Sequence, residues 1–233
     1  MLLLTIIFYT ALAIWTILMG FLSLPFLFLP SKYIRFPAKI WIKGIFVFLQ
    51  YICGITHEIR GHKNLSSKPL IIVSKHQSAF ETFALYYYLE NSFFIHKKQL
   101  FFIPIFGQYL WKSNMVSIDR TGQASTMRKM ISSIKSKLDD GSTIIIFPEG
   151  TRKKPGEKAD YKTGFIGIYN TTKRKLQPVA LNSGLFWQKG LKVIKKGHII
   201  IEFLPQIDID LDKTEVLKKV EYSIESATNN LLD

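Results

Sequence analysis

The sequence predicts an α/β fold, in which helices flank a mostly parallel central sheet, preceded by an N-terminal apolar helical membrane anchor. Two observations predict it. Short apolar runs that lack a period-two alternation are typical of strands buried on both faces, and stretches with helical spacing separate them. In addition, residues 1–31 carry no charged side chain. With roughly 150 residues as the usual domain size, a chain of 233 residues suits one such domain and its anchor.

The N-terminal run is long enough to cross a bilayer, which takes about 20 apolar residues. Pro25 and Pro30 should end its helix. The next apolar stretch, residues 44–55, is too short for a comfortable second span. One span and a re-entrant hairpin both remain open, whereas core helices of a soluble protein fit 31 uncharged residues less well. We assign residues 1–56 to the anchor and 57–233 to the α/β domain.

The net charge of +14 indicates an anionic partner, either a lipid surface or nucleic acid. Most aromatic residues lie in apolar runs, which disfavours nucleic acid. Lys32, Arg35, Lys39 and Lys43 follow the first apolar run and belong at a negatively charged cytoplasmic surface. The expected location is the inner (cytoplasmic) membrane, with the α/β domain on its cytoplasmic side. Cys53, the single cysteine, is expected to be a small apolar side chain.

The α/β domain should begin after a polar, turn-rich connector, residues 56–69, whose His57 and His62 are expected to be solvated. Apolar or β-branched runs predict strands at residues 70–74, 93–96, 115–118, 143–147, 178–181 and 198–204. Helical spacing predicts helices at residues 79–89, 124–138 and 164–170, and an amphipathic C-terminal helix from Val216 to Leu231. The alternation of these strands and helices supports the mostly parallel sheet.

Polar residues cluster where three of the apolar runs end, which suggests one active site at one edge of the sheet. His76 follows the first predicted strand, and Glu81 lies five residues later. An imidazole held by a carboxylate is a natural general base for a hydroxyl, although an isolated pair at this spacing is more often structural. We find no convincing nucleophile and no zinc-ligand spacing. These residues favour direct, base-assisted transfer without a covalent enzyme intermediate.

Arg120 and Arg152 each follow an apolar run, where a guanidinium can bind a phosphate through two hydrogen bonds. Glu149, Gly150 and Thr151 place an acid and a flexible backbone beside Arg152. Either arginine alone would more often form a surface salt bridge.

These motifs together resemble the lysophosphatidic acid acyltransferase family, also called the 1-acylglycerol-3-phosphate O-acyltransferases. The similarity runs in order over roughly residues 70–185. It comprises His76 to Glu81, the segment Lys97 to Gly107, Ile118-Asp119-Arg120, Phe147-Pro-Glu-Gly-Thr-Arg152, Lys162-Thr-Gly164 and Gln177 to Leu181. One departure is Glu81, where the common form of the motif has Asp.

The resemblance implies acyl transfer from a thioester of coenzyme A or acyl carrier protein to the sn-2 hydroxyl of lysophosphatidic acid, without metal or prosthetic group. The product, phosphatidic acid, would serve phospholipid biosynthesis. His76 would be the base and Glu81 its partner. Lys98, Arg120 and Arg152 would bind the phosphate, and Glu149, Gly150 and Thr151 would shape the acceptor site. Other lysolipid acceptors, such as lyso-ornithine lipid or lysocardiolipin, and a non-catalytic lipid-binding relative are the alternatives.

Overall fold

The computed structural model describes residues 2–65, 70–103, 106–113, 115–118, 124–190 and 195–232. Its centre is a seven-stranded sheet with the order β1-β7-β6-β2-β5-β3-β4. The strands are β1 (Ile55–Arg60), β2 (Ile71–Ser74), β3 (Ser92–Lys97), β4 (Val116–Ile118), β5 (Thr143–Ile146), β6 (Leu176–Leu181) and β7 (Gly197–Phe203). All neighbouring strands pair in parallel except β6 and β7, which are antiparallel. This confirms the predicted mostly parallel sheet.

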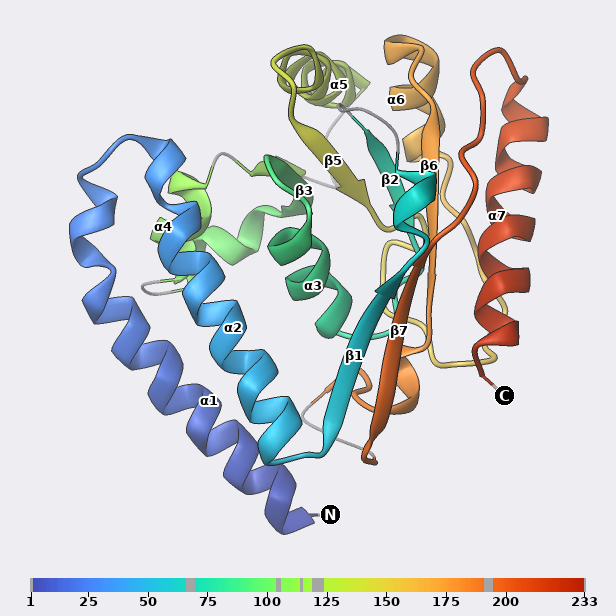
Figure 1. Ribbon diagram of the computed structural model, residues 1–233. Coiled ribbons are helices and arrows are strands. Elements are labelled where there is room, and N and C mark those ends of the chain that lie inside the picture. The colour runs from blue at the N-terminus through green and yellow to red at the C-terminus, as the bar shows by residue number, and fades with distance from the viewer. Residues whose placement is uncertain are drawn as a thin grey trace.

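Helices cover both faces of the sheet (Figure 1). They are α1 (Leu2–Leu22), α2 (Arg35–Tyr51), α3 (Phe80–Tyr88), α4 (Phe106–Lys112), α5 (Ala124–Asp139), α6 (Gly164–Thr172) and α7 (Lys213–Asn230). Adjacent residues of the buried strands point to opposite faces. Thus Ile72 joins the core formed with α2 and α3, whereas Ile71 joins the core formed with α5, α6 and α7. The strands lack polar alternation because both of their faces are buried.

The first two helices form an antiparallel hairpin along one side of the molecule (Figure 1). α1 ends at Leu22, before Pro25, as the sequence predicts. The Trp15 indole donates a hydrogen bond to the Trp41 carbonyl at 2.9 Å, and the Trp41 indole donates to the Thr16 hydroxyl at 3.0 Å. Within the described residues, α1 is the one helix long and apolar enough to cross a membrane, by length and composition.

Both ends of α1 contact the α/β domain. Near the N-terminus, the Phe8 ring packs edge-on against Trp187, with 5.5 Å between ring centroids. Near the other end, the Tyr109 hydroxyl of α4 donates a hydrogen bond to the Gly20 carbonyl at 2.6 Å. The helix therefore lies along the domain instead of projecting away from it.

Three sequence expectations in this region were wrong. Residues 55–60 form β1 and not a turn-rich connector, because they pair in parallel with residues 197–202. His57 is half-buried against Phe46 and Phe80 instead of solvated, and burial lowers its pKa, with His198 adding to the effect. Arg35 turns inward and donates hydrogen bonds to backbone carbonyls at the end of α3 and at the start of β3. Cys53 is buried in the core, which confirms its apolar role.

Candidate active site

Three neighbouring parallel strands bring the predicted site residues to one edge of the sheet. β2 lies between β5 and β6, and the carboxyl ends of parallel strands meet at the same edge. The segments that leave these ends carry His76 after β2, Phe147 to Arg152 after β5, and Ser183 after β6. Residues from three distant parts of the sequence therefore share one site.

The imidazole of His76 is held by a buried carboxylate. His76 Nδ1 lies 2.9 Å from Glu81 Oε1. The histidine side chain is 16% exposed and Glu81 is fully buried. Because the carboxylate accepts at Nδ1, the second nitrogen, Nε2, is the one that can take a proton from a substrate. The common form of the motif has Asp here. The longer side chain of Glu81 nevertheless makes the hydrogen bond to the histidine from this position.

Glu81 accepts three further hydrogen bonds. It lies in the first turn of α3, where Oε1 turns back to the N–H groups of Gln77 and Ser78, each at 2.7 Å. Free backbone donors that precede a helix favour a carboxylate at this position. The Ser183 hydroxyl donates to the other oxygen, Oε2, at 2.7 Å. The four donors fix the orientation of the carboxylate and satisfy its charge.

The loop that follows β5 holds His76 on three sides. The Phe147 ring stacks on the imidazole, with 4.0 Å between centroids and 17° between the ring planes. The Lys153 N–H donates to the His76 carbonyl at 2.9 Å, and the His76 N–H donates to Glu149 Oε1 at 2.8 Å. The histidine is consequently fixed through its ring and through both polar groups of its backbone.

Glu149 lies behind the histidine and is only 3% exposed. Its Oε2 is 3.4 Å from the ammonium of Lys75, which is also buried. Burial raises the pKa of Glu149, and the positive charge of Lys75 opposes that rise. The Glu149 carboxylate thus contacts Lys75 and the His76 N–H, and through these contacts it helps to hold His76 in place.

The remaining predicted residues lie in the segments that follow β5 and β3 or outside the described part. Gly150 adopts a left-handed backbone, with φ of 66°, which explains the glycine in this turn. Thr151 is exposed and its hydroxyl lies 3.4 Å from Lys189 Nζ, while Arg152 is half-buried. Lys98 is exposed directly after β3. Arg120 lies outside the described residues, as does Asp119.

Several residues that shape the site were not predicted from the sequence. Ser183 follows a predicted strand that ends in Leu181, so the strand-end rule used for His76 would have selected it. Phe147 lies inside a motif already quoted, but only the three-dimensional structure shows that it stacks on His76. The partner of Lys75 on α7, Glu225, has no local signal because 150 positions separate the two residues.

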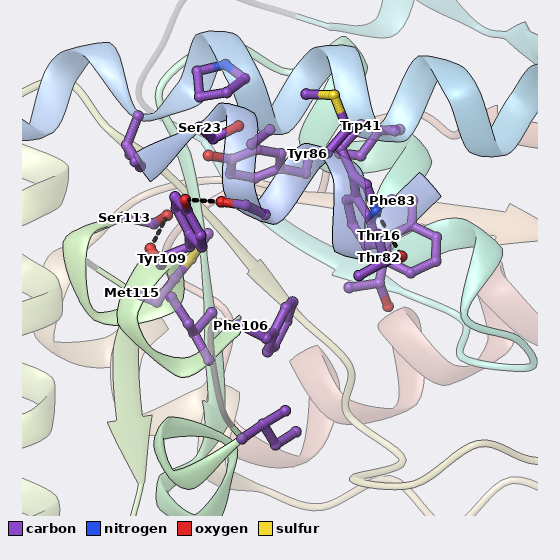
Figure 2. Close-up of a pocket in the computed structure, with 18 of the residues that line it drawn as sticks. Thr16, Ser23, Trp41, Thr82, Phe83, Tyr86, Phe106, Tyr109, Ser113 and Met115 are labelled. Atoms are coloured by element: carbon purple, nitrogen blue, oxygen red, sulfur yellow. Dashed lines mark hydrogen bonds between the residues drawn. The ribbon is translucent and has the colours of Figure 1, made fainter. Parts of the chain in front are cut away.

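An apolar cavity of about 340 Å³ lies between the helical hairpin and the α/β domain. Figure 2 shows its walls, formed by α1, α2, α3 and the region of α4. Its volume is within the range of about 300–1,000 Å³ that is usual for small-molecule sites. Phe94 lines the cavity and stacks on Phe147 at 5.9 Å, and Phe147 in turn stacks on His76. The Phe94 and Phe147 rings therefore form a stack that leads from the lining of the cavity to the base.

A histidine base held by a buried carboxylate, beside an apolar cavity, suits an enzyme that activates a hydroxyl of an amphiphilic substrate. Among the described residues, no group of three or more His, Cys, Asp or Glu side chains is arranged to hold a metal ion.

Comparison with known proteins identifies the class more closely. The family model described as Acyltransferase matches residues 56–182. The 1-acyl-sn-glycerol-3-phosphate acyltransferase of Pseudomonas aeruginosa is 31% identical over 189 residues, covering 79% of this chain and 73% of the relative. The enzyme of the same name from Helicobacter pylori is 34% identical over 148 residues, covering 62% and 61%.

The whole fold also has a solved counterpart. The crystal structure of the 1-acyl-sn-glycerophosphate (LPA) acyltransferase PlsC from Thermotoga maritima covers 99% of this chain and 95% of its own, with a TM-score of 0.79 and 25% identity. The chain thus belongs to the lysophosphatidic acid acyltransferase family, and it is an acyltransferase.

Proposed function

We propose that this enzyme transfers a fatty acyl group from an acyl thioester to the sn-2 hydroxyl of lysophosphatidic acid, giving phosphatidic acid. The observation that carries the proposal is the hydrogen bond of 2.9 Å between His76 Nδ1 and the buried Glu81. It leaves Nε2 as the ring nitrogen that can act as a general base. The names of the relatives support the choice of acceptor.

The reaction needs one proton shuttle and no enzyme nucleophile. His76 Nε2 takes the proton of the acceptor hydroxyl while its oxygen attacks the thioester carbonyl carbon. Glu81 stabilises the imidazolium that forms, as a carboxylate does in other histidine-based sites. When the tetrahedral intermediate collapses, the C–S bond breaks and the imidazolium returns the proton to the leaving sulfur. The products are the ester and the free thiol, and His76 is neutral again.

The two ends of the lysolipid require different surroundings. Arg152, half-buried in the loop that follows β5, is suited to the phosphate, together with Lys98 and Arg120. The acyl chain of the donor is suited to the apolar cavity behind Phe147 and Phe94 (Figure 2). In this arrangement the thioester carbonyl lies near His76 and the chain extends under the hairpin. The donor is the thioester of coenzyme A or acyl carrier protein, and no metal or prosthetic group takes part.

The hairpin would hold the enzyme on the cytoplasmic face of the inner membrane. α1 carries many exposed apolar side chains, and further exposed aromatic residues lie at the turn that follows it, shortly before α4 and within α4. Examples are Ile14, Phe21, Phe28, Phe102 and Trp111. An apolar surface of this kind suits insertion into one leaflet. Because both ends of α1 contact the α/β domain, the hairpin would lie in one leaflet instead of crossing the bilayer.

The test is an assay of purified enzyme in liposomes with lysophosphatidic acid and a long-chain acyl thioester. His76→Ala should lower kcat at least about 100-fold, whereas His62→Ala, which changes an exposed histidine away from the site, should retain activity. A chelator should leave the rate unchanged. Equal rates for wild type and His76→Ala would remove His76 from the role of base. Product from lyso-ornithine lipid or lysocardiolipin, but not from lysophosphatidic acid, would overturn the assignment of lysophosphatidic acid as the acceptor.

A further inference from the structure

Behind the catalytic loop lies a buried cluster of charged side chains drawn from three parts of the chain. Lys75 precedes the catalytic histidine and is only 2% exposed. Its ammonium lies 3.4 Å from Glu149 Oε2 and 2.8 and 3.0 Å from the two carboxylate oxygens of Glu225 on α7. The Tyr161 hydroxyl donates a hydrogen bond to Glu225 at 2.7 Å. The Lys75 ammonium is thus paired with two carboxylates, those of Glu149 and Glu225.

Fold stability does not account for this cluster. Removing charged groups from water costs several kcal/mol per ion, and buried ion pairs are often no more stabilising than apolar side chains of similar size. The cluster also has one more acid than base, and burial raises the pKa of both Glu149 and Tyr161. Apolar side chains at these positions would stabilise the fold at least as well. We therefore expect the cluster to have a functional role.

The cluster is connected to the base through one side chain. Glu149 contacts Lys75 with one carboxylate oxygen and accepts the His76 N–H with the other, at 2.8 Å. Lys75 is bonded to His76 through the peptide chain and donates its own N–H to the Val179 carbonyl at 3.0 Å. A change in the position of the Lys75 ammonium therefore acts on the histidine backbone from two directions.

We propose that Glu225 is a positioning residue for the catalytic base: through Lys75 and Glu149 it fixes the backbone, and with it the ring, of His76. The inference rests on the proposed function, since it assigns the geometry of that same site to the C-terminal helix. Glu225 lies beyond residues 56–182, the part of the chain that the family model matches.

Glu225→Gln is the variant that tests this role. Replacing Lys75 by an apolar residue would leave two carboxylates facing each other in the interior, and such a chain would fail to fold. The Glu225 side chain, by contrast, is 24% exposed, and glutamine keeps its shape while removing the charge. Glu221→Gln is the matched control: the same change one turn earlier on the same helix, at a half-buried position.

Enzyme assays in liposomes should separate positioning from support of the fold. Displacing a reacting group by 1 Å can cost about 100-fold in rate, so we expect Glu225→Gln to lower kcat by about 10-fold or more, with KM changed less than about twofold. Glu221→Gln should match wild type, and Glu225→Asp should restore part of the rate. In a Glu149→Gln background, Glu225→Gln should cause little further loss, because the connection is already broken.

Histidine NMR provides a readout that needs no acyl acceptor. With the five histidines isotopically labelled, and the His76 signal assigned from its absence in His76→Ala, Glu225→Gln should shift the His76 ring signal and Glu221→Gln should not. An unshifted signal, or kcat losses that simply multiply in the Glu149→Gln background, would overturn the positioning role. Wild-type enzyme without activity on lysophosphatidic acid would overturn the proposed acceptor alone, since the NMR result still decides the role of Glu225.

Discussion

The orientation of the His76 ring depends on one buried side chain. Glu81 fixes the ring at Nδ1 and is itself fixed by Gln77, Ser78 and Ser183. The serine hydroxyl comes from the segment after the neighbouring strand β6, so two separate segments of the chain set the orientation of the base. Substitutions at these residues should therefore have graded effects on catalysis.

Glu81→Gln should lower kcat by about 100-fold or more, because a neutral amide cannot stabilise the imidazolium. Ser183→Ala should cause a smaller loss, since three of the four donors to Glu81 remain. Steady-state kinetics with lysophosphatidic acid would measure both. A greater loss for Ser183→Ala than for Glu81→Gln would show that the serine, and not the acid, dominates.

Cys53 provides a prediction that depends on pH. Burial raises the pKa of its thiol to about 11, so the native thiol stays protonated at pH 8. Maleimide should therefore label the native enzyme slowly and the denatured enzyme fully. Because the unfolded thiol ionises first, near pH 8.5, folding stability should decrease as pH rises from about 9 to 11. Cys53→Ala should lose this pH dependence, and rapid labelling of native protein at pH 8 would contradict the assignment.

At the scale of elements, Arg35 joins the start of α2 to the end of α3. Its guanidinium donates to the carbonyls of Tyr86, Leu89 and Ser92 and lies 4.2 Å from the centroid of the Tyr86 ring. The last carbonyls of a helix have no partner within the helix, so a cation there satisfies them. Arg35 is thus a bridge between the hairpin and the sheet-bound helices.

Arg35→Leu should lower the free energy of unfolding by roughly 2–3 kcal/mol, the range for lost hydrogen bonds to a charged group. Urea denaturation in detergent would measure the loss. Lys43→Leu, at an exposed position of the same helix, is the control and should have little effect. Equal stability of the two variants would contradict the bridging role.

The cavity beneath the hairpin offers a second prediction at this scale. Ala38 of α2 lines the cavity, whereas Ile40 of the same helix is exposed. Ala38→Phe should reduce the space for an acyl chain and shift the preference of the enzyme towards shorter donors, as measured with a series of acyl thioesters. Ile40→Phe should leave the chain-length profile unchanged. A profile unaffected by Ala38→Phe would place the acyl chain elsewhere.

For the whole molecule, the hairpin and the α/β domain share one hydrophobic core. Phe8 of α1 and Ile45 of α2 are buried in the same cluster as Leu85 and Ile199. Both ends of α1 are held against the domain. Residues at the two ends of this helix should therefore face the same aqueous compartment.

Single cysteines at Leu3 and Lys32 should therefore both react with a membrane-impermeant thiol reagent from the cytoplasmic side. The natural Cys53 is buried and gives a silent background in native protein. Labelling of inside-out and right-side-out vesicles would measure the sidedness. Reaction of the two positions from opposite sides would demonstrate a transmembrane span.

Local sequence patterns were sufficient for the buried strands and the longer helices, because each of these depends on its own hydrophobic periodicity. β1 was missed because its polar Thr56, Glu58 and Arg60 resemble a connector, and its single strand neighbour lies almost at the other end of the chain. In the site, His76 and Glu81 were paired from their spacing together with the family resemblance, since a pair at this spacing alone is more often structural. The contacts of Lys75 with Glu225 and of Glu81 with Ser183 depend on the tertiary fold, which no local pattern encodes.

The pairing of β1 with β7 also determines when this enzyme can finish folding. β1 leaves the ribosome directly after the hairpin, yet its partner strand, residues 197–203, comes about 140 residues later. At about 5–20 residues per second, the delay is roughly 7–28 s. Trp187, the partner of Phe8, is almost as late. During synthesis the nascent chain must therefore keep an apolar helix and an unpaired strand edge from aggregating, and early contact of the first helix with lipid would protect both.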